Sequence, residues 1–139
     1  MKAIFKELET EEELKRVLDL CYRVLGNEHP EIYGYNAWLQ RLHDVKQPLL
    51  YAECDGKVVS AVLGRYESDD SLIIGMVACD EEYRNRGITK KLIECFEARA
   101  KEMGFKYITL GSKEDAFYEK CGYKRISTDS DQSVYQKQL

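Results

Sequence analysis

The sequence predicts an α/β (α+β) domain with a mixed, mostly antiparallel sheet of six to seven strands and about four helices. Short apolar runs typical of strands alternate with runs whose apolar residues recur at helical spacing, in the order β-α-α-β-β-β-α-β-α-β-β. An Asp55-Gly56 pair predicts that two strand-like runs form an antiparallel hairpin. One strand–helix–strand stretch, residues 72–110, predicts a right-handed crossover between parallel strands.

The N-terminal elements follow from capping signals and spacing. Residues 2–8 alternate loosely and predict a short strand. Thr10 and Glu13 match a capping box, and apolar residues then keep helical spacing until Gly26. A second helix is expected to begin near Pro30. Its apolar positions are Ile32, Tyr35, Trp38, Leu39 and Leu42.

The middle of the chain predicts the centre of the sheet. Residues 49–66 hold the two strands of the hairpin, and polar residues 67–71 follow as a turn. The run LIIGMVAC, residues 72–79, is mostly unbroken in its apolar character, which indicates a central strand. Between Gly87 and Gly104 the apolar period becomes that of a helix.

The C-terminal residues predict a strand at 105–110, a brief helix at 112–121, and two last strands at 123–128 and 133–138. Ser112 and Asp115 suit capping roles in the brief helix. A C-terminal strand, residues 132–138, is expected at an edge of the sheet. Because an edge strand can pair with a second copy, a homodimer stays open.

Composition limits the class of protein. The 139 residues are expected to form one domain, 1–139, and the net charge of −4 argues against a nucleic-acid partner. No apolar run reaches the roughly 18 residues of a membrane span. The N-terminal MKAIFKELET lacks a signal-peptide core, so we expect a cytoplasmic protein.

The cysteines point away from a metal site. They are odd in number and irregularly spaced, with no Cys-x-x-Cys pair, which favours reduced, packed thiols and predicts no metal. The five are Cys21, Cys54, Cys79, Cys95 and Cys121.

The stretch CDEEYRNRGITKKLIECF carries the strongest chemical signal. Arg84, Arg86 and Gly87 stand where a strand gives way to a long helix. Unpaired amides at a helix start attract anions, glycine lets an anion approach the backbone, and arginines add fork-shaped donors, so the turn suits a diphosphate. The alternative is a helix that merely starts with solvated arginines paired to Glu81 and Glu82. No nucleotide-triphosphate loop and no Gly-x-Gly-x-x-Gly is present.

MVACDEEYRNRGITKKLIECF resembles the acetyl-CoA-binding segment of the GCN5-related N-acetyltransferase (GNAT) family, whose pattern after a strand is Arg/Gln-x-x-Gly-x-Gly/Ala. Arg84, Gly87 and Thr89 occupy those positions. DAFYEKCGYKRI is similar to the second signature of the family, an aromatic-Tyr pair before Gly-Phe/Tyr. The similarity is dense over residues 72–126. It departs at Glu81, where relatives often have proline, and at Thr89 and Gly111.

The resemblance implies a GNAT-like acyl-CoA N-acyltransferase fold and acetyl-CoA as the cosubstrate. The cosubstrate would lie in a cleft between splayed strands 72–79 and 106–110. The cofactor-binding residues that the resemblance implies are Val77, Ala78, Cys79, Arg84, Asn85, Arg86, Gly87, Ile88, Thr89 and Lys90. Thr89 either crowds the cosubstrate or adds a phosphate contact. Gly111 replaces an asparagine, which removes one expected hydrogen bond.

Tyr118 is the catalytic residue that the resemblance implies. Its phenol would protonate the departing CoA thiolate. The alternative is a tyrosine that only packs between helix and sheet. Cys79 has no assignable histidine partner, so we interpret it as a packing residue and not as a nucleophile. Four acids are candidates for a general base by position only, and none is chosen. They are Glu53, Asp80, Glu81 and Glu82.

The expected activity is transfer of an acetyl group to a primary amine by direct attack in a ternary complex. The acceptor, a small molecule or a peptide, is expected to meet residues 26–44. Acids and aromatic residues mix there, which favours a cationic acceptor, although each of them also suits the core or the surface. They are Glu28, His29, Glu31, Tyr33, Tyr35 and Trp38. His43 is interpreted as a surface residue. The alternatives are a catalytically weak or inactive CoA-binding sensor of the same fold and a plain interaction domain.

Overall fold

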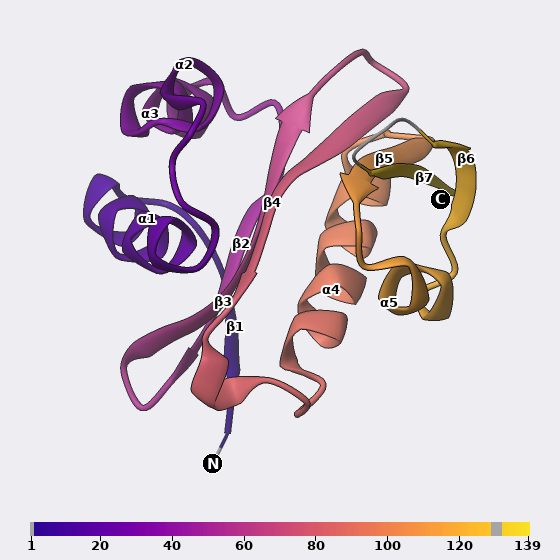
Figure 1. The fold of residues 1–139 in the computed structure, drawn as a ribbon. Coiled ribbons are helices and arrows are strands. Elements are labelled where there is room, and N and C mark those ends of the chain that lie inside the picture. The colour runs from indigo at the N-terminus through magenta and orange to yellow at the C-terminus, as the bar shows by residue number, and fades with distance from the viewer. Residues whose placement is uncertain (1, 129–131) are drawn as a thin grey trace.

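A computed structural model describes residues 2–128 and 132–139 (Figure 1). The strands form a seven-stranded sheet in the order β1-β2-β3-β4-β5-β7-β6. Among the strands of the described residues, β4 and β5 alone pair in parallel. The strands are β1 (Ile4–Glu7), β2 (Leu49–Cys54), β3 (Lys57–Tyr66), β4 (Ser71–Cys79), β5 (Tyr107–Ser112), β6 (Lys124–Thr128) and β7 (Ser133–Gln138).

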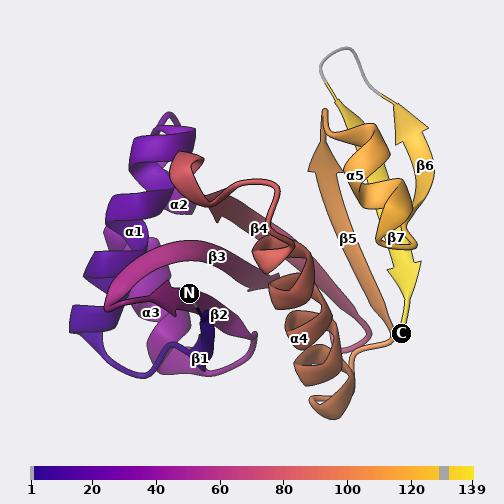
Figure 2. The ribbon, with the colours of Figure 1, turned by 90° about the horizontal axis from the view of Figure 1, so that it is seen from below.

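Helices cover both faces of the sheet. The first three lie on one face, and α4 lies on the other with α5 beside it (Figures 1 and 2). The helices are α1 (Glu11–Leu25), α2 (Pro30–Tyr33), α3 (Tyr35–Asp44), α4 (Ile88–Glu102) and α5 (Asp115–Lys120), with a 3₁₀ turn, η1 (Glu81–Tyr83), before α4. The predicted mixed, mostly antiparallel architecture is confirmed.

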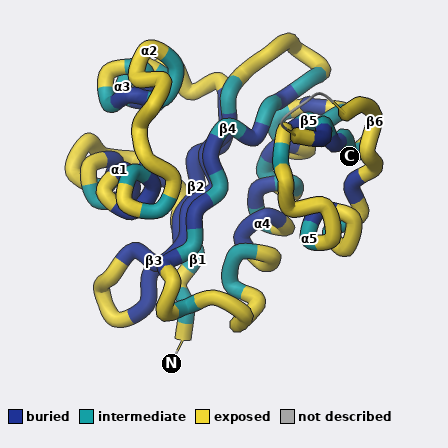
Figure 3. The backbone as a smooth tube through the Cα atoms, in the orientation of Figure 1, coloured by how far each residue is buried: buried dark blue, intermediate teal, exposed yellow. Residues whose placement is uncertain are grey.

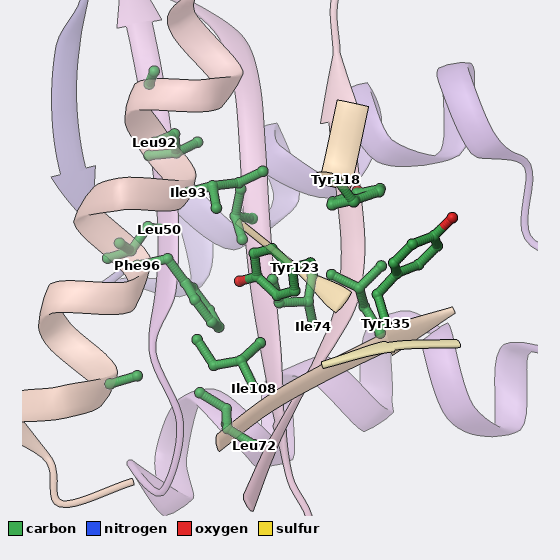
Figure 4. Close-up of a cluster of buried hydrophobic side chains, with 14 of the residues drawn as sticks. Leu50, Leu72, Ile74, Leu92, Ile93, Phe96, Ile108, Tyr118, Tyr123 and Tyr135 are labelled. Atoms are coloured by element: carbon green, nitrogen blue, oxygen red, sulfur yellow. The ribbon is translucent and has the colours of Figure 1, made fainter. Parts of the chain in front are cut away.

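Each face has its own core, and burial is deepest where the sheet meets the helices (Figure 3). On the α1–α3 face, Trp38 is fully buried. On the other face, Phe96 of α4 packs near three tyrosines that cover the β5–β7 end of the sheet (Figure 4). These tyrosines are Tyr118, Tyr123 and Tyr135. Apolar burial on both faces holds β4 at the centre of the molecule, as its sequence predicts.

Local signals placed two elements correctly. The Thr10 hydroxyl accepts the Glu13 amide at 3.1 Å while the Glu13 side chain accepts the Thr10 amide at 3.0 Å, which is the predicted capping box. Asp55 and Gly56 have φ values of 51° and 78°, as a two-residue hairpin turn requires.

The predicted second helix is two helices. The chain is extended at Gly34, with φ −75° and ψ 169°, so α2 ends and α3 begins there. A Cβ at Gly34 would lie 2.4 Å from the Pro30 carbonyl oxygen, which explains the need for glycine at this close approach.

The C-terminal strand is not at an edge, so that prediction is wrong. β7 lies between β5 and β6, and the edge strands are β1 and β6. Six register pairs join β7 to β5, from Tyr107–Gln138 to Ser112–Ser133. The backbone groups of β7 are therefore used within the sheet and are not open to a second copy.

Candidate active site

The two parallel strands separate soon after they meet. β4 and β5 share three register pairs, from Ser71–Tyr107 to Ile73–Thr109. Across the described residues, the part of β4 after Ile73 has no strand partner on the β5 side. Opposite Leu63 and Gly64 of β3, β4 carries one extra residue, Gly75, so the strand bulges where it leaves β5. An unpaired edge of this kind offers N–H and C=O groups to a ligand.

A cleft of about 570 Å³ opens at this separation. Its walls come from the end of α1, the unpaired part of β4, the turn before α4, the first turn of α4, β5 and α5. All predicted site residues line it except Ala78, whose side chain is buried against the α1–α3 core. The predicted residues that line it are Val77, Cys79, Tyr118 and the whole run Arg84 to Lys90.

The turn before α4 has the geometry of an anion site. Asn85 and Gly87 adopt left-handed backbone conformations, with φ 64° and 77°, and nothing lies within 4 Å of the place where a Cβ on Gly87 would stand. The first helical bond of α4 runs from the Lys91 amide to the Gly87 carbonyl at 3.1 Å. The amides of Ile88 to Lys90 therefore have no hydrogen-bond acceptor within the helix, and the helix dipole places partial positive charge at these amides.

Two basic side chains beside this turn contact the ring of Tyr83. The guanidinium carbon of Arg86 lies 5.0 Å from the centre of the Tyr83 ring, and Lys57 Nζ lies 5.6 Å from it. Cation–π contacts of this length orient a guanidinium. Sequence reasoning missed Tyr83, although its place one residue before Arg84 was a usable signal.

Thr89 faces the sheet. Its Oγ1 lies 2.8 Å from Ser60 Oγ, and Ser60 Oγ donates to the Ala78 carbonyl at 2.9 Å. Because the one hydroxyl proton of Ser60 goes to that carbonyl, Thr89 must be the donor to Ser60. The hydroxyl of Thr89 therefore fixes the first turn of α4 to Ser60 of β3, and its proton is used in that bond. Thr89 also lines the cleft, so crowding of the cosubstrate stays a prediction.

Asp80 joins three segments beneath the turn. Its buried carboxylate accepts the Glu82 amide at 2.9 Å and lies 3.1 Å from Arg23 of α1 and 3.2 Å from Lys57 of the hairpin. Burial raises the pKa of Asp80, but the Glu82 amide, Lys57 and Arg23 outweigh burial and hold that pKa below its ordinary value. Asp80 is thus occupied by structural contacts and does not suit a general base.

Tyr118 reaches the cleft from α5. Its side chain is 5% exposed. Its ring packs edge-on against Phe117, with centroids 5.0 Å apart, and against Tyr123, with centroids 6.0 Å apart (Figure 4). Burial raises the pKa of the phenol well above 10, and the charges of Cys121 and Glu114 add to the effect. The phenol therefore stays protonated at any ordinary pH. Tyr118 therefore packs between helix and sheet and also lines the cleft.

Only one carboxylate lines the cleft among the residues described, and sequence reasoning did not select it. It is the exposed Glu114, just before α5. Of the positional candidates, Glu53 is held by Lys6 at 2.9 Å and Arg16 at 3.5 Å. Glu81 and Glu82 are exposed on η1 and do not line the cleft.

Gly111 lies at the wall of the cleft beneath a side chain that directly precedes the neighbouring strand, β7. A Cβ at Gly111 would lie 2.4 Å from Nε2 of Gln132. A side-chain amide therefore stands near position 111 although the residue itself has none. An asparagine at this position would require Gln132 to move.

The acids between α1 and α3 lie away from the cleft. His29 and Glu31 form a pair at 3.5 Å in which both side chains are 65% exposed, and neither they nor Glu28 line the cleft. Tyr33 and Trp38 stack with centroids 6.4 Å apart. His43 is exposed, as interpreted.

No group of His, Cys, Asp or Glu within residues 2–128 and 132–139 has the arrangement of a metal site. In the same residues, no helix is long and apolar enough to span a bilayer.

Comparison with known families supports the resemblance. A family model described as "Acetyltransferase (GNAT) family" matches residues 11–123. The match includes the turn before α4 and most of the second signature, through Tyr123. No curated protein matches the chain by sequence.

Solved structures share the fold over nearly the whole chain. An acetyltransferase of the GNAT family from Staphylococcus aureus Mu50 has a TM-score of 0.84 at 16% identity, with 99% of each chain covered. The PaiA N-acetyltransferase of Thermoplasma acidophilum, in complex with coenzyme A, has a TM-score of 0.80 at 17% identity, with 100% of each chain covered. A GNAT acetyltransferase from Elizabethkingia anophelis with acetyl-CoA bound has a TM-score of 0.75 at 12% identity, with 99% of this chain and 98% of that one covered. At these identities the likeness establishes the fold.

Proposed function

The chain belongs to the GNAT acetyltransferase family, and we propose that it transfers an acetyl group from acetyl-CoA to a primary amine by direct attack in a ternary complex. The observation that carries this proposal is the open turn at Gly87, which lies beside the unpaired edge of β4 in the same cleft as Tyr118. A single domain, residues 1–139, would hold the whole site.

The cleft fits coenzyme A in its chemistry. The diphosphate would accept hydrogen bonds from the amides of Ile88 to Lys90, with Arg84 and Arg86 adding charge. The amide groups of the pantetheine arm would pair with the backbone of β4 from Val77 to Cys79. When bound, acetyl-CoA supplies an acyl group activated as a thioester.

Residues of this chain would then govern the transfer. An N–H on the unpaired edge of β4 would stabilise the negative charge that develops on the carbonyl oxygen. As the nitrogen–carbon bond forms, the carbon–sulfur bond breaks, and Tyr118 would give its proton to the departing thiolate. The amine must lose a proton. Glu114, the carboxylate at the wall of the cleft, would receive it through water.

Release of free thiol from acetyl-CoA tests this function. We expect CoA to raise the melting temperature of the protein and at least one class of amine to cause thiol release, in a panel of polyamines, aminoglycosides, amino acids and peptides. Stabilisation by CoA without release for any amine would instead identify a CoA-binding sensor. Absence of stabilisation would leave only an interaction domain.

A further inference from the structure

The bulge of β4 brings an arginine close behind Gly75, on the sheet face that α1–α3 cover; Arg65 itself does not line the cleft. Gly75 lines the cleft. A Cβ at Gly75 would lie 2.8 Å from Cδ of Arg65 and 3.1 Å from Cη2 of Trp38. Only the absence of a side chain at Gly75 lets these two groups pack directly behind the strand where the cleft opens.

Arg65 and Arg41 are fixed there on an aromatic platform. The guanidinium carbon of Arg65 lies 5.5 Å from the centre of the Tyr33 ring, and that of Arg41 lies 4.4 Å from the Trp38 ring. Arg65 Nη1 is 3.4 Å from the Tyr33 hydroxyl, and Arg41 Nη1 donates to the Ile32 carbonyl at 2.7 Å. Both side chains are partly buried, so the direction in which each guanidinium group points is largely set before any ligand binds.

These two charges have no counterion within the described chain. No carboxylate oxygen of a described residue lies within 4.0 Å of either guanidinium, whereas Arg16, Arg23 and Arg99 each have one. Burial lowers the pKa of Arg41, and the charge of Arg65 lowers it further. Two partly buried like charges side by side are unfavourable unless an anion neutralises them.

We propose that Arg65 and Arg41 form an acceptor subsite for an anion, so that the acceptor is an amine that also carries a carboxylate or a phosphate group. This inference rests on the proposed function. It differs from the expectation of a cationic acceptor. The acidic residues behind that expectation are exposed, as in the His29–Glu31 pair, whereas the two arginines are partly buried. The amine would approach the thioester past Gly75 while its anionic group is bound by the two forks.

Pairs of amine acceptors that differ in one anionic group test whether the enzyme prefers an anionic acceptor. Free L-amino acids are compared with the corresponding L-amino acid amides, and O-phosphoethanolamine with ethanolamine. Amino acid amides have the less basic amine, so intrinsic reactivity near pH 8 favours them and works against the prediction. We expect kcat/KM to be at least about 10-fold higher for the anionic member of one pair. Which pair responds separates carboxylate from phosphate.

Variants assign the preference to the subsite. Arg65→Met should reduce the discrimination between anionic and neutral acceptors to about twofold or less, with the KM for acetyl-CoA unchanged. Arg65→Lys should keep part of it, because the charge remains and the fork is lost. Arg125→Met, on the exposed strand β6, is the matched control and should behave as the wild type.

Binding of reaction products provides a readout that needs no turnover. An N-acetyl-L-amino acid should bind the CoA-loaded protein more tightly than its carboxamide, and Arg65→Met should abolish the difference. Equal use of the paired acceptors, together with equal binding of the paired products, would overturn this inference and leave acetyl transfer intact. Failure of CoA to bind would overturn the proposed function, and the inference with it.

Discussion

Tyr118 combines a buried ring with a place at the wall of the cleft. We predict that Tyr118→Phe lowers kcat about 10- to 100-fold, at the lower end of general-acid effects because a thiolate is already a good leaving group. Affinity for CoA should stay unchanged. Because the pKa of Tyr118 is raised well above 10, the phenol stays protonated through the working range, so the loss should be the same from pH 6 to 9.

The neighbouring Tyr123 is the matched control for this substitution. Its hydroxyl is buried beside Glu97, and Tyr123 does not line the cleft. Tyr123→Phe should leave kcat unchanged. If Tyr118→Phe also had no effect when the chemical step limits the rate, Tyr118 would not be the acid.

Thr89 is predicted to act through stability more than through binding. Thr89→Val removes the donor to Ser60 and should lower the free energy of unfolding by about 1 kcal/mol, as for one lost hydrogen bond. Affinity for CoA should stay within about threefold of the wild type, whereas Thr89→Ser should restore the stability. Urea denaturation and calorimetric titration measure the two effects. A large loss of affinity at full stability would show that the hydroxyl binds phosphate after all.

At the scale of elements, Asp80 links α1, the hairpin and η1 under the turn that precedes α4. Asp80→Asn should lower the free energy of unfolding by about 1–2 kcal/mol at pH 7, since hydrogen bonds to a charged group are lost. It should also weaken CoA binding, because the turn is then less firmly held.

The effect of Asp80 has a defined pH dependence. The pKa of Asp80 is lowered in the folded protein, so its stabilising contribution is complete above the unfolded value of about 3.9. That contribution is lost as the pH falls from about 4 through the lower folded pKa. The stability difference between wild type and Asp80→Asn should therefore shrink below pH 4. A difference that stays constant down to pH 2 would exclude ionisation of Asp80 as its source.

Elements governed by local signals could be predicted from the sequence, and those governed by distant contacts could not. The capping box at Thr10 and the Asp55-Gly56 turn depend on residues a few positions apart. The break at Gly34 is also local, because Pro30 lies only four residues earlier, but the helical spacing of the apolar residues on both sides conceals it. The place of β7 between β5 and β6 depends on long-range pairing, and chain order gives no sign of it.

The same contrast holds for the whole molecule. The turn from Arg84 to Lys90 is contiguous, so its residues were predicted together, and the structure places all of them along one cleft with Tyr118. Groups that the sheet brings in from elsewhere were missed. Ser60 under Thr89, Gln132 over Gly111 and Arg65 behind Gly75 each come from a strand or segment distant in the chain. Tertiary packing alone creates these pairs.

The molecule depends for its proposed activity on one binding event, the capture of the CoA diphosphate at Gly87. Gly87→Glu places bulk and negative charge in that open space and should weaken CoA binding more than about 100-fold. Gly56→Glu is the matched control, because Gly56 has a φ of 78° against 77° at Gly87 and also has nothing within 4 Å of its Cβ position. Strain from the left-handed backbone should be similar in both variants.

Calorimetric titration of CoA into these two variants and the wild type is the most direct measurement. We predict that Gly56→Glu binds CoA as the wild type does, while Gly87→Glu, folded and equally stable, does not bind it measurably. Wild-type affinity in Gly87→Glu would contradict the proposed diphosphate site.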